Sequence, residues 1–388
     1  MQALLNARVL TERGLETGLA VRLQGDTILD VVRAEPSALG NCESIDLGGQ
    51  VLAPGFIDLQ VNGGGDVLFN DAPNVATLRR IASAHRRFGT TSMLPTLISS
   101  EREVLRVGIG AVRETIAAKI AGVLGIHIEG PFIAAARKGV HDPRMFRGID
   151  ATDIELMAAP GHGRTLVTLA PERVEPTLVA QLCQRGIIVA AGHTDASYEI
   201  TRTALDAGMS GFTHLFNAMS PLQGRAPGVV GAALEDRSSW CGVIVDGQHV
   251  HPAALRVALA AKPRGKVVLV TDAMPPVGGG RVDFQLDGRV ITCRDGRCTT
   301  ADGVLAGSCL DMATAVRNTV RLLAVPLDEA LRMASTYPAN VLGLERSHGR
   351  IAAGYRADLV ALDAALMVRS VWCGGIRELH ATTQSRID

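Results

Sequence analysis

The chain has 388 residues, 47% of them apolar, which is enough for one large α/β barrel with a small appendage or for two ordinary domains. Its 39 basic and 39 acidic side chains give a formal net charge of zero, so neither a nucleic-acid surface nor a charged tail is indicated. The N-terminus lacks a signal-peptide pattern and no segment stays apolar for the roughly 18 residues of a membrane span, so we expect a cytoplasmic protein that acts on a small molecule, without nucleic-acid or membrane partners.

The two ends of the chain share one sequence pattern. Residues 1–50 alternate short apolar runs with turn residues such as Gly14 and Gly25, which predicts a small β unit. Residues 347–388 repeat this alternation. We therefore expect both ends to build one small β-sandwich domain beside a central domain of residues 51–346.

Between these ends, apolar runs alternate with amphipathic helices, which predicts a parallel sheet. The expected strands are 51–59, 91–97, 123–128, 166–169, 187–191, 211–215, 241–245 and 267–270, and the helices between them include 75–88, 102–120, 176–185, 198–207 and 252–261. Eight such units over about 220 residues fit a closed (β/α)8 barrel. An open doubly wound sheet is the alternative, but Gly63-Gly64-Gly65 after the first strand lacks the spacing of a phosphate-binding turn.

Residues 282–307 interrupt the helical pattern with Asp-Gly turns at Asp287, Asp295 and Asp302. We expect a β excursion here, between the eighth strand and its helix at 308–323, and then one more helix at 327–342. Cys293 and Cys298 flank one of these turns, which argues against a zinc ribbon. We expect all seven cysteines to be reduced packing residues: Cys42, Cys183, Cys241, Cys293, Cys298, Cys309 and Cys373.

Polar side chains gather where the expected strands end, the edge at which parallel α/β barrels place their chemistry. They are Gln60, Asn62, His127, Glu129, His193, His214, Asp246 and Asp272. A single histidine at such a position is more often a hydrogen-bonded packing residue, but His193 and His214 follow neighbouring strands. With one carboxylate they would make a three-ligand catalytic site suited to Zn²⁺ or Fe²⁺. Asp272, held near this metal but not bound to it, could take the proton of the attacking water.

The chain carries six short motifs: Pro54-Gly55-Phe56-Ile57-Asp58, His127-Ile128-Glu129-Gly130-Pro131-Phe132, Gly192-His193-Thr194, Thr213-His214-Leu215-Phe216-Asn217-Ala218-Met219, Asp246-Gly247-Gln248-His249 and Val270-Thr271-Asp272-Ala273. Over nearly the whole chain, in this order, they resemble the N-acetylglucosamine-6-phosphate deacetylase family of the amidohydrolase superfamily. The first motif marks only the superfamily. The Glu-Gly-Pro and His-Leu-Phe-Asn-Ala-Met segments are much narrower signals.

This resemblance implies that Glu129, His193 and His214 bind one divalent metal ion, and that Asp272 is the general base and then the general acid. Many amidohydrolases hold a second metal with His-x-His at the end of the first strand. Here that place reads Gln60-Val61-Asn62, whose amides are poor ligands for such an ion. We therefore expect one metal ion per subunit, Zn²⁺ or Fe²⁺, and the resemblance implies a homodimer.

The resemblance also implies a set of substrate-binding residues: Val140, His141, Asn217, Ala218, Arg225, His249, Leu305, Ala306 and Gly307. Among them, Arg225 and His249 would bind the phosphate, and Arg225 could reach the neighbouring subunit's site. Because Arg225 lies in a stretch rich in glycine and proline, a solvated loop residue is the alternative. We expect the other five histidines to be structural or surface residues: His85, His162, His251, His348 and His380.

The function that the resemblance implies is the metal-dependent hydrolysis of N-acetylglucosamine 6-phosphate to glucosamine 6-phosphate and acetate. N-acetylgalactosamine 6-phosphate, which differs at one hydroxyl configuration, is the alternative substrate. Cyclic-amide hydrolases and deaminases are more distant alternatives because they usually keep the His-x-His pair. A non-catalytic sugar-phosphate binding protein is the alternative from another class, although such a protein has no use for a proton acceptor at Asp272.

Overall fold

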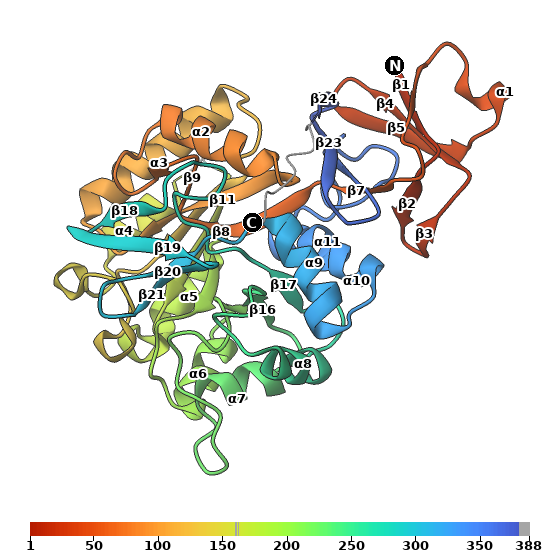
Figure 1. Cartoon of the computed structure of the whole chain (residues 1–388). Coiled ribbons are helices and arrows are strands. Elements are labelled where there is room, and N and C mark those ends of the chain that lie inside the picture. Colours follow the sequence, from red (N-terminus) through yellow and green to blue (C-terminus); the bar gives the residue numbers. More distant parts are fainter. Residues whose placement is uncertain (160, 162, 380–388) are drawn as a thin grey trace.

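The computed structural model describes residues 1–159, 161 and 163–379, so the expected roles of His162 and His380 lie outside the described residues. It consists of a barrel and a smaller β domain to which both ends of the chain contribute (Figure 1). Both parts confirm the expected α/β fold class. Among the described residues, no helix combines the length and the apolar character needed to cross a membrane.

The barrel is an eight-stranded sheet in which every pair of neighbours is parallel. Its strands are β8 (Phe56–Val61), β11 (Thr90–Ile98), β12 (Gly125–Glu129), β13 (Arg164–Leu169), β14 (Ile188–Ala191), β15 (Gly211–Phe212), β16 (Trp240–Val243) and β17 (Val267–Leu269). The ring closes because Val61 pairs in parallel with Ala273, and Asn62 donates its backbone N–H to the Ala273 carbonyl. All eight expected strands are therefore present, in chain order around the barrel.

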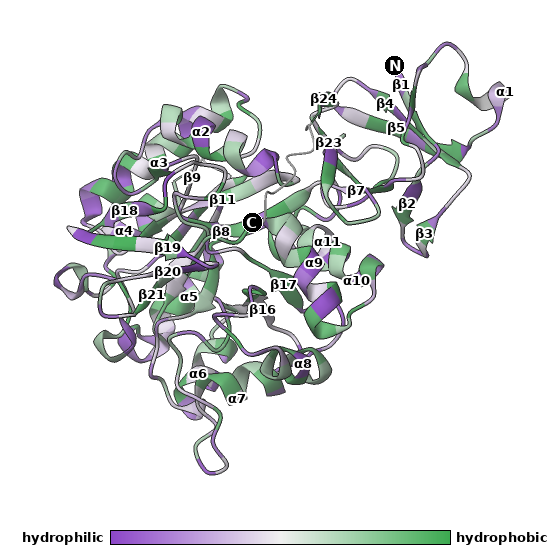
Figure 2. Ribbon diagram, in the orientation of Figure 1, coloured by the Kyte–Doolittle hydropathy of each residue, from purple (hydrophilic) through white to green (hydrophobic). Residues whose placement is uncertain are grey.

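Helices surround the sheet on the outside, and α2 and α3 among them carry both hydrophobic and hydrophilic residues (Figures 1 and 2). They are α2 (Val75–Arg86), α3 (Arg102–Ala117), α4 (Ala151–Met157), α5 (Pro176–Gln184), α6 (Tyr198–Asp206), α7 (Gly228–Glu235), α8 (Pro252–Ala261), α9 (Met312–Leu323), α10 (Leu327–Ala334) and α11 (Thr336–Val341), with short 3₁₀ turns η1 (Ala135–Arg137), η2 (Pro143–Met145) and η3 (Pro171–Arg173). α2 shows why such segments are helical. Asn74 caps its first turn by accepting from Thr77 N–H, and Leu78 and Ile81 on one face are buried.

The small domain packs two sheets face to face. One contains β5 (Thr27–Arg33), β4 (Leu19–Gln24), β1 (Gln2–Leu5) and β6 (Glu43–Asp46), and the other contains β24 (Ile376–Leu379), β23 (Val368–Cys373), β22 (Leu359–Leu362), β7 (Val51–Pro54), β2 (Arg8–Thr11) and β3 (Gly14–Glu16); α1 (Pro36–Leu39) lies between β5 and β6. Leu4, Val21, Leu52 and Trp372 are buried between the sheets. The expected β-sandwich is confirmed.

The expected strand 51–59 is in fact two strands, β7 of the small domain and β8 of the barrel. Gly55 separates them, and its N–H donates to the Asp358 carbonyl in the small domain. A Cβ at position 55 would lie 2.1 Å from Thr91 Oγ1 of the barrel. Only glycine therefore allows the chain to pass from one sheet to the other at this point.

The expected β excursion is confirmed as a four-stranded antiparallel sheet of β18 (Asp283–Leu286), β19 (Arg289–Arg294), β20 (Arg297–Thr299) and β21 (Leu305–Ser308); β9 (Gly63–Gly64) and β10 (Val67–Leu68) form a separate hairpin. The structure corrects the expectation that every cysteine is reduced. Cys293 and Cys298 stand directly opposite each other on β19 and β20 and form a disulfide. The turn at Asp295-Gly296, with positive φ at both residues, sets this register.

Candidate active site

Four polar side chains meet at the mouth of the barrel because the strands that carry them all end there. Glu129 is the last residue of β12, His193 and His214 follow β14 and β15 by two residues, and Asp272 follows β17. The backbone turns at these points, since φ is +49° at His193, +33° at His214 and +54° at Asp272. Positive φ is uncommon for residues other than glycine and concentrates at functional sites.

Glu129, His193 and His214 converge on one point. His214 Nε2 lies 2.9 Å from Glu129 Oε1, His193 Nε2 lies 3.3 Å from the same oxygen, and the two imidazole nitrogens are 3.1 Å apart. All three residues are buried. Two imidazoles and one carboxylate, with ligand atoms within 4.8 Å of one another, form a donor set that fits a divalent cation such as zinc.

His193 is held in the orientation that a metal ligand requires. Its Nδ1–H donates to the backbone carbonyl of Arg137 over 2.9 Å, and a carbonyl can only accept. In a neutral imidazole, a proton on Nδ1 leaves a free lone pair on Nε2, the atom that faces Glu129. Glu172 fixes the following turn by accepting from Thr194 Oγ1 at 2.5 Å and from Asp195 N–H at 2.6 Å.

The two amides at the end of β8 act as hydrogen-bond donors to the carboxylates. Gln60 Nε2 donates to Glu129 Oε1 and to Asp272 Oδ1, each at 3.0 Å, and Asn62 Nδ2 donates to Asp272 Oδ1 at 2.6 Å. Gln60 thus links Glu129, one member of the converging donor set, to Asp272. Behind them, Asp58 accepts from Thr271 Oγ1 at 2.6 Å and ties β8 to the end of β17.

The two carboxylates of the site have different electrostatic environments. Burial raises the pKa of Asp272 to about 6, and the nearby charge of Glu129 adds to the shift, while His214, His249 and the Asn62 hydrogen bond partly offset it. Burial also acts on Glu129, but its interactions with His193 and His214 outweigh it and hold its pKa well below the usual range. Glu129 therefore stays charged, whereas Asp272 can exchange a proton near neutral pH.

His127 and Asp246, the other polar residues expected at strand ends, have different surroundings. His127 is fully buried between Thr96 and Thr168, with its Nε2 2.7 Å from Thr168 Oγ1, and burial lowers its pKa to about 4. It is a packing residue inside the barrel. Asp246 accepts from His249 Nδ1 at 2.6 Å and from His249 N–H at 2.9 Å, which orients the His249 ring.

A cavity of about 230 Å³ opens above the four converging side chains. Seven of the nine expected substrate-binding residues line it: Val140, His141, Asn217, Ala218, His249, Leu305 and Gly307. His141 is buried, and its Nδ1 lies 2.8 Å from Ser99 Oγ, which places its ring centroid 4.4 Å from that of His193. The eighth, Ala306, is fully buried in the core of the inserted sheet.

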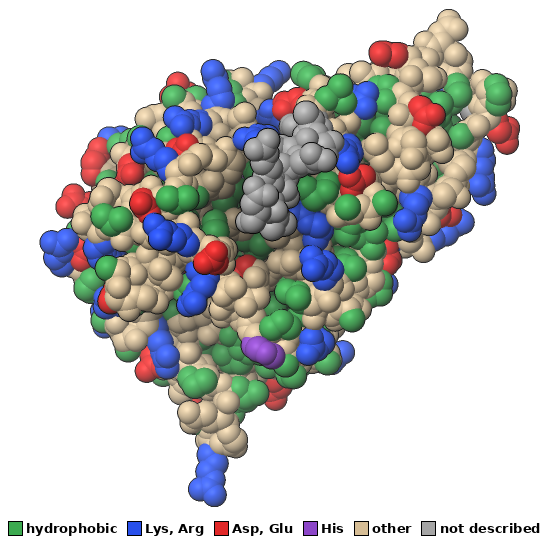
Figure 3. All heavy atoms as spheres, viewed as in Figure 1, with side chains coloured by type: hydrophobic (Ala, Val, Ile, Leu, Met, Phe, Trp, Pro, Cys, Tyr) green, Lys and Arg blue, Asp and Glu red, His purple; other side chains and the backbone are tan. Residues whose placement is uncertain are grey.

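The ninth, Arg225, does not line this cavity. It is exposed in the segment before α7, which projects from the barrel in Figure 1, and it borders a separate hollow of about 310 Å³ with Arg137 and Asp195. The face in Figure 3 shows basic and acidic side chains interspersed, with a basic side chain at the tip of the projection. Within one chain, Arg225 is therefore outside the cavity that contains Asp272.

Sequence reasoning missed several residues of the cavity wall: Ile98, Gly139, Met274 and Val304. Ile98 ends β11 and Val304 precedes β21, and neither has a chemical feature that marks it in the sequence. Ser99, which orients His141, follows directly after β11, so its position at a barrel-strand end was the available signal. Arg289 of the inserted sheet also donates to the Val140 carbonyl and holds the loop that carries His141.

The model of the amidohydrolase family matches residues 51–377. The chain belongs to the amidohydrolase family. This amidohydrolase is 42% identical to the N-acetylgalactosamine-6-phosphate deacetylase of Shewanella sp. strain ANA-3, over 98% of this chain and 96% of the relative. It is 35% identical to the N-acetylglucosamine-6-phosphate deacetylase of Haemophilus influenzae, over 92% of this chain and 94% of the relative. The crystal structure of N-acetylglucosamine-6-phosphate deacetylase from Pasteurella multocida superposes with a TM-score of 0.94 at 36% identity, covering 98% of this chain and all of that one.

Proposed function

We propose that this amidohydrolase removes acetate from N-acetylglucosamine 6-phosphate, giving glucosamine 6-phosphate. The observation that carries the proposal is the position of Asp272, which shares the Gln60 amide with Glu129 and faces the cavity beside the cation-binding set. A protein that only binds a sugar phosphate gains nothing from a buried proton acceptor there. The names of the relatives identify the amide that would be cleaved.

Glu129, His193 and His214 would hold one divalent cation, Zn²⁺ or Fe²⁺. When bound, such a cation polarises a carbonyl and makes water more acidic. Asp272 accepts the proton of the attacking water and then donates it to the nitrogen of the departing sugar amine. A pKa near neutrality lets one carboxylate perform both transfers. Gln60 and Asn62 hold Asp272 in place but, as amides, provide no second cation site.

The remaining cavity residues would position the substrate. His141, next to His193, would donate to the acetyl carbonyl or to the sugar, while His249 and the backbone near Asn217 and Ala218 would contact the phosphate end. Leu305 and Gly307 form part of the wall, and buried Ala306 holds that strand against the sheet core. Energy gained at the phosphate can orient the acetyl group for attack.

Arg225 would complete the phosphate site in a second copy of the chain. Its guanidinium is exposed outside its own cavity, and a planar fork of donors suits a phosphate group. We therefore propose a homodimer in which each subunit supplies Arg225 to the other. We also propose a cytoplasmic protein in which residues 1–50 and 347–388, together with β7, form the small domain and the rest of residues 51–346 forms the hydrolase barrel.

N-acetylgalactosamine 6-phosphate is the second candidate substrate, favoured by the 42% identity to the Shewanella deacetylase named for that sugar. The test is to measure acetate release from both sugar phosphates and from both unphosphorylated sugars. The proposal predicts the larger kcat/KM for the glucosamine derivative and a strong loss without phosphate. A larger kcat/KM for the galactosamine derivative would assign the second substrate. Equal rates with and without phosphate would remove the phosphate from the proposed function.

A further inference from the structure

The disulfide of the inserted sheet has a third cysteine beside it. The sulfur atoms of Cys293, Cys298 and Cys309 all lie within 4.8 Å of one another. Cys293 and Cys298 pair across β19 and β20, while Cys309 follows the last residue of β21 and is a free thiol. Three sulfurs from two connected segments, in a chain of only seven cysteines, form a cluster that the proposed hydrolysis does not use.

The three cysteines differ in their access to solvent. Cys293 is 6% exposed and Cys298 is fully buried, whereas Cys309 is only partly buried at the edge of the same apolar cluster. A dissolved thiol or disulfide can therefore reach Cys309 more easily than either partner of the disulfide. Burial raises the pKa of the Cys309 thiol, a backbone hydrogen bond partly offsets this shift, and the charge of Asp246 adds to it.

We propose that Cys293, Cys298 and Cys309 form a thiol–disulfide exchange site, with Cys309 as the entry thiol for a small-molecule disulfide. The Cys309 thiolate attacks one sulfur of the small disulfide, forming a mixed disulfide and releasing one small thiol. The thiolate of Cys293 or Cys298 then attacks Cys309 Sγ and releases the second small thiol. The remaining thiolate of this pair attacks the sulfur of its partner that is now bonded to Cys309, which forms Cys293–Cys298 and returns Cys309 as a thiol. Two electrons pass from the hairpin pair to the small disulfide.

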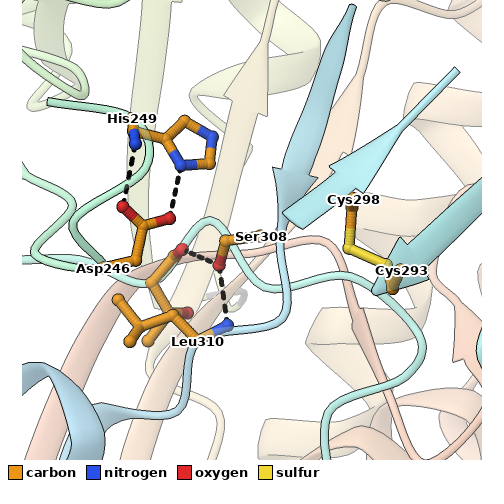
Figure 4. The surroundings of a disulfide bond; sticks show 7 residues. Asp246, His249, Cys293, Cys298, Ser308 and Leu310 are labelled. Atoms are coloured by element: carbon orange, nitrogen blue, oxygen red, sulfur yellow. Dashed lines mark hydrogen bonds and ion pairs between the residues drawn. A yellow bond between two sulfur atoms is a disulfide. The ribbon is translucent and has the colours of Figure 1, made fainter. Parts of the chain in front are cut away.

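The exchange site adjoins the cavity that contains Asp272. Ser308, the residue before Cys309, donates its backbone N–H to the Asp272 carbonyl and its hydroxyl to the Thr271 carbonyl. Figure 4 shows Ser308 between the disulfide and the Asp246–His249 pair, and Leu310 donates its backbone N–H to the Ser308 hydroxyl. The hairpin cysteines also pack in one cluster with Ile98 and Met274, which line the cavity. The exchange site thus lies against the wall of the substrate cavity.

The positions of the aspartates allow each disulfide pairing of these three cysteines to be identified by proteolysis. Cleavage before aspartate places each cysteine in its own peptide: 287–294 for Cys293, 295–301 for Cys298 and 302–310 for Cys309. The full-length protein is reduced, freed of reductant and mixed with glutathione disulfide. Samples are then quenched in acid, alkylated, digested and analysed by mass spectrometry over time.

We expect a glutathione adduct on peptide 302–310 to appear first and to decay as peptides 287–294 and 295–301 become linked. The Cys309→Ser variant should form this link at least tenfold more slowly, whereas Cys42→Ser, which removes a partly buried thiol of the small domain, should match the parent. The Cys293→Ser/Cys298→Ser double variant should retain the adduct on Cys309. Linking at the parent's rate in Cys309→Ser, a first adduct on a hairpin cysteine, or a hairpin that stays reduced would each overturn the proposal.

Discussion

Asn62 Nδ2 lies 2.6 Å from Asp272 Oδ1, so an amide at the end of the first barrel strand holds the carboxylate at the end of the eighth. The neighbouring amide of Gln60 adds a second bond to the same oxygen at 3.0 Å. Both bonds stabilise the charged carboxylate, because an amide N–H donates most strongly to an anion. Gln60 and Asn62, which stand where many amidohydrolases have the His-x-His pair, therefore orient Asp272, the proposed base.

Asn62→Ala tests this role. The Asn62 hydrogen bond lowers the pKa of Asp272 against the larger effect of burial, so its loss should raise that pKa further. Because the reaction needs the charged carboxylate, the acidic limb of the kcat/KM–pH profile should move to higher pH. In the metal-loaded parent, the acidic limb should have its midpoint at or below about pH 6, since a nearby cation favours the charged form of Asp272. A limb that does not move in Asn62→Ala would show that another group controls it.

Asp272→Asn should separate proton transfer from binding. The amide keeps the size of the side chain but cannot accept the proton, so kcat should fall on the order of a hundredfold or more. Metal content and affinity for the sugar phosphate should remain, measured by elemental analysis and by calorimetry with the unreacted substrate. A variant that loses its metal but regains full turnover when metal is added back would make Asp272 a ligand instead.

The purified protein should hold about one divalent ion per chain, because only one converging set of two histidines and a carboxylate is found among the described residues. His193→Ala or His214→Ala should remove both the ion and the activity. His127→Asn is the control, since His127 is bonded to Thr96 and Thr168 and is not part of the set. Two ions per chain, both needed for activity, would contradict the one-metal proposal.

Arg225 can be tested by complementation. If it acts in a second subunit, Arg225→Ala should weaken the preference for phosphorylated sugar while barely changing activity on the unphosphorylated sugar. Mixed dimers of Arg225→Ala with Asp272→Asn should regain activity, because one site then combines an intact Asp272 with an intact Arg225 from its neighbour. Mixed dimers as inactive as the two single variants would place both residues in one chain's site. An unchanged preference for the phosphorylated sugar in Arg225→Ala would show that Arg225 is a solvated loop residue.

The sequence pattern predicted the architecture, because strands and their ends follow from local periodicity. It also predicted the edge at which the polar groups meet, because a closed barrel fixes which strand ends are neighbours. It did not predict features that depend on strand register or on contacts between distant parts of the fold. The Cys293–Cys298 pairing needs the register of β19 and β20, and the break at Gly55 needs the approach of Thr91. The bonds from Gln60 to Glu129 and Asp272 need the closure of β8 against β17, which no local pattern encodes.

The most direct test of the account is acetate release from N-acetylglucosamine 6-phosphate by the parent and by Asp272→Asn, each stripped of metal and then given about one equivalent of Zn²⁺ or Fe²⁺ per chain. We expect no release from either stripped protein, recovery in the parent with one equivalent, and roughly a hundredfold less release from the reloaded variant. The same release from the reloaded variant as from the parent would contradict the role of Asp272. No acetate from the reloaded parent with either epimer would contradict the proposed deacetylase itself.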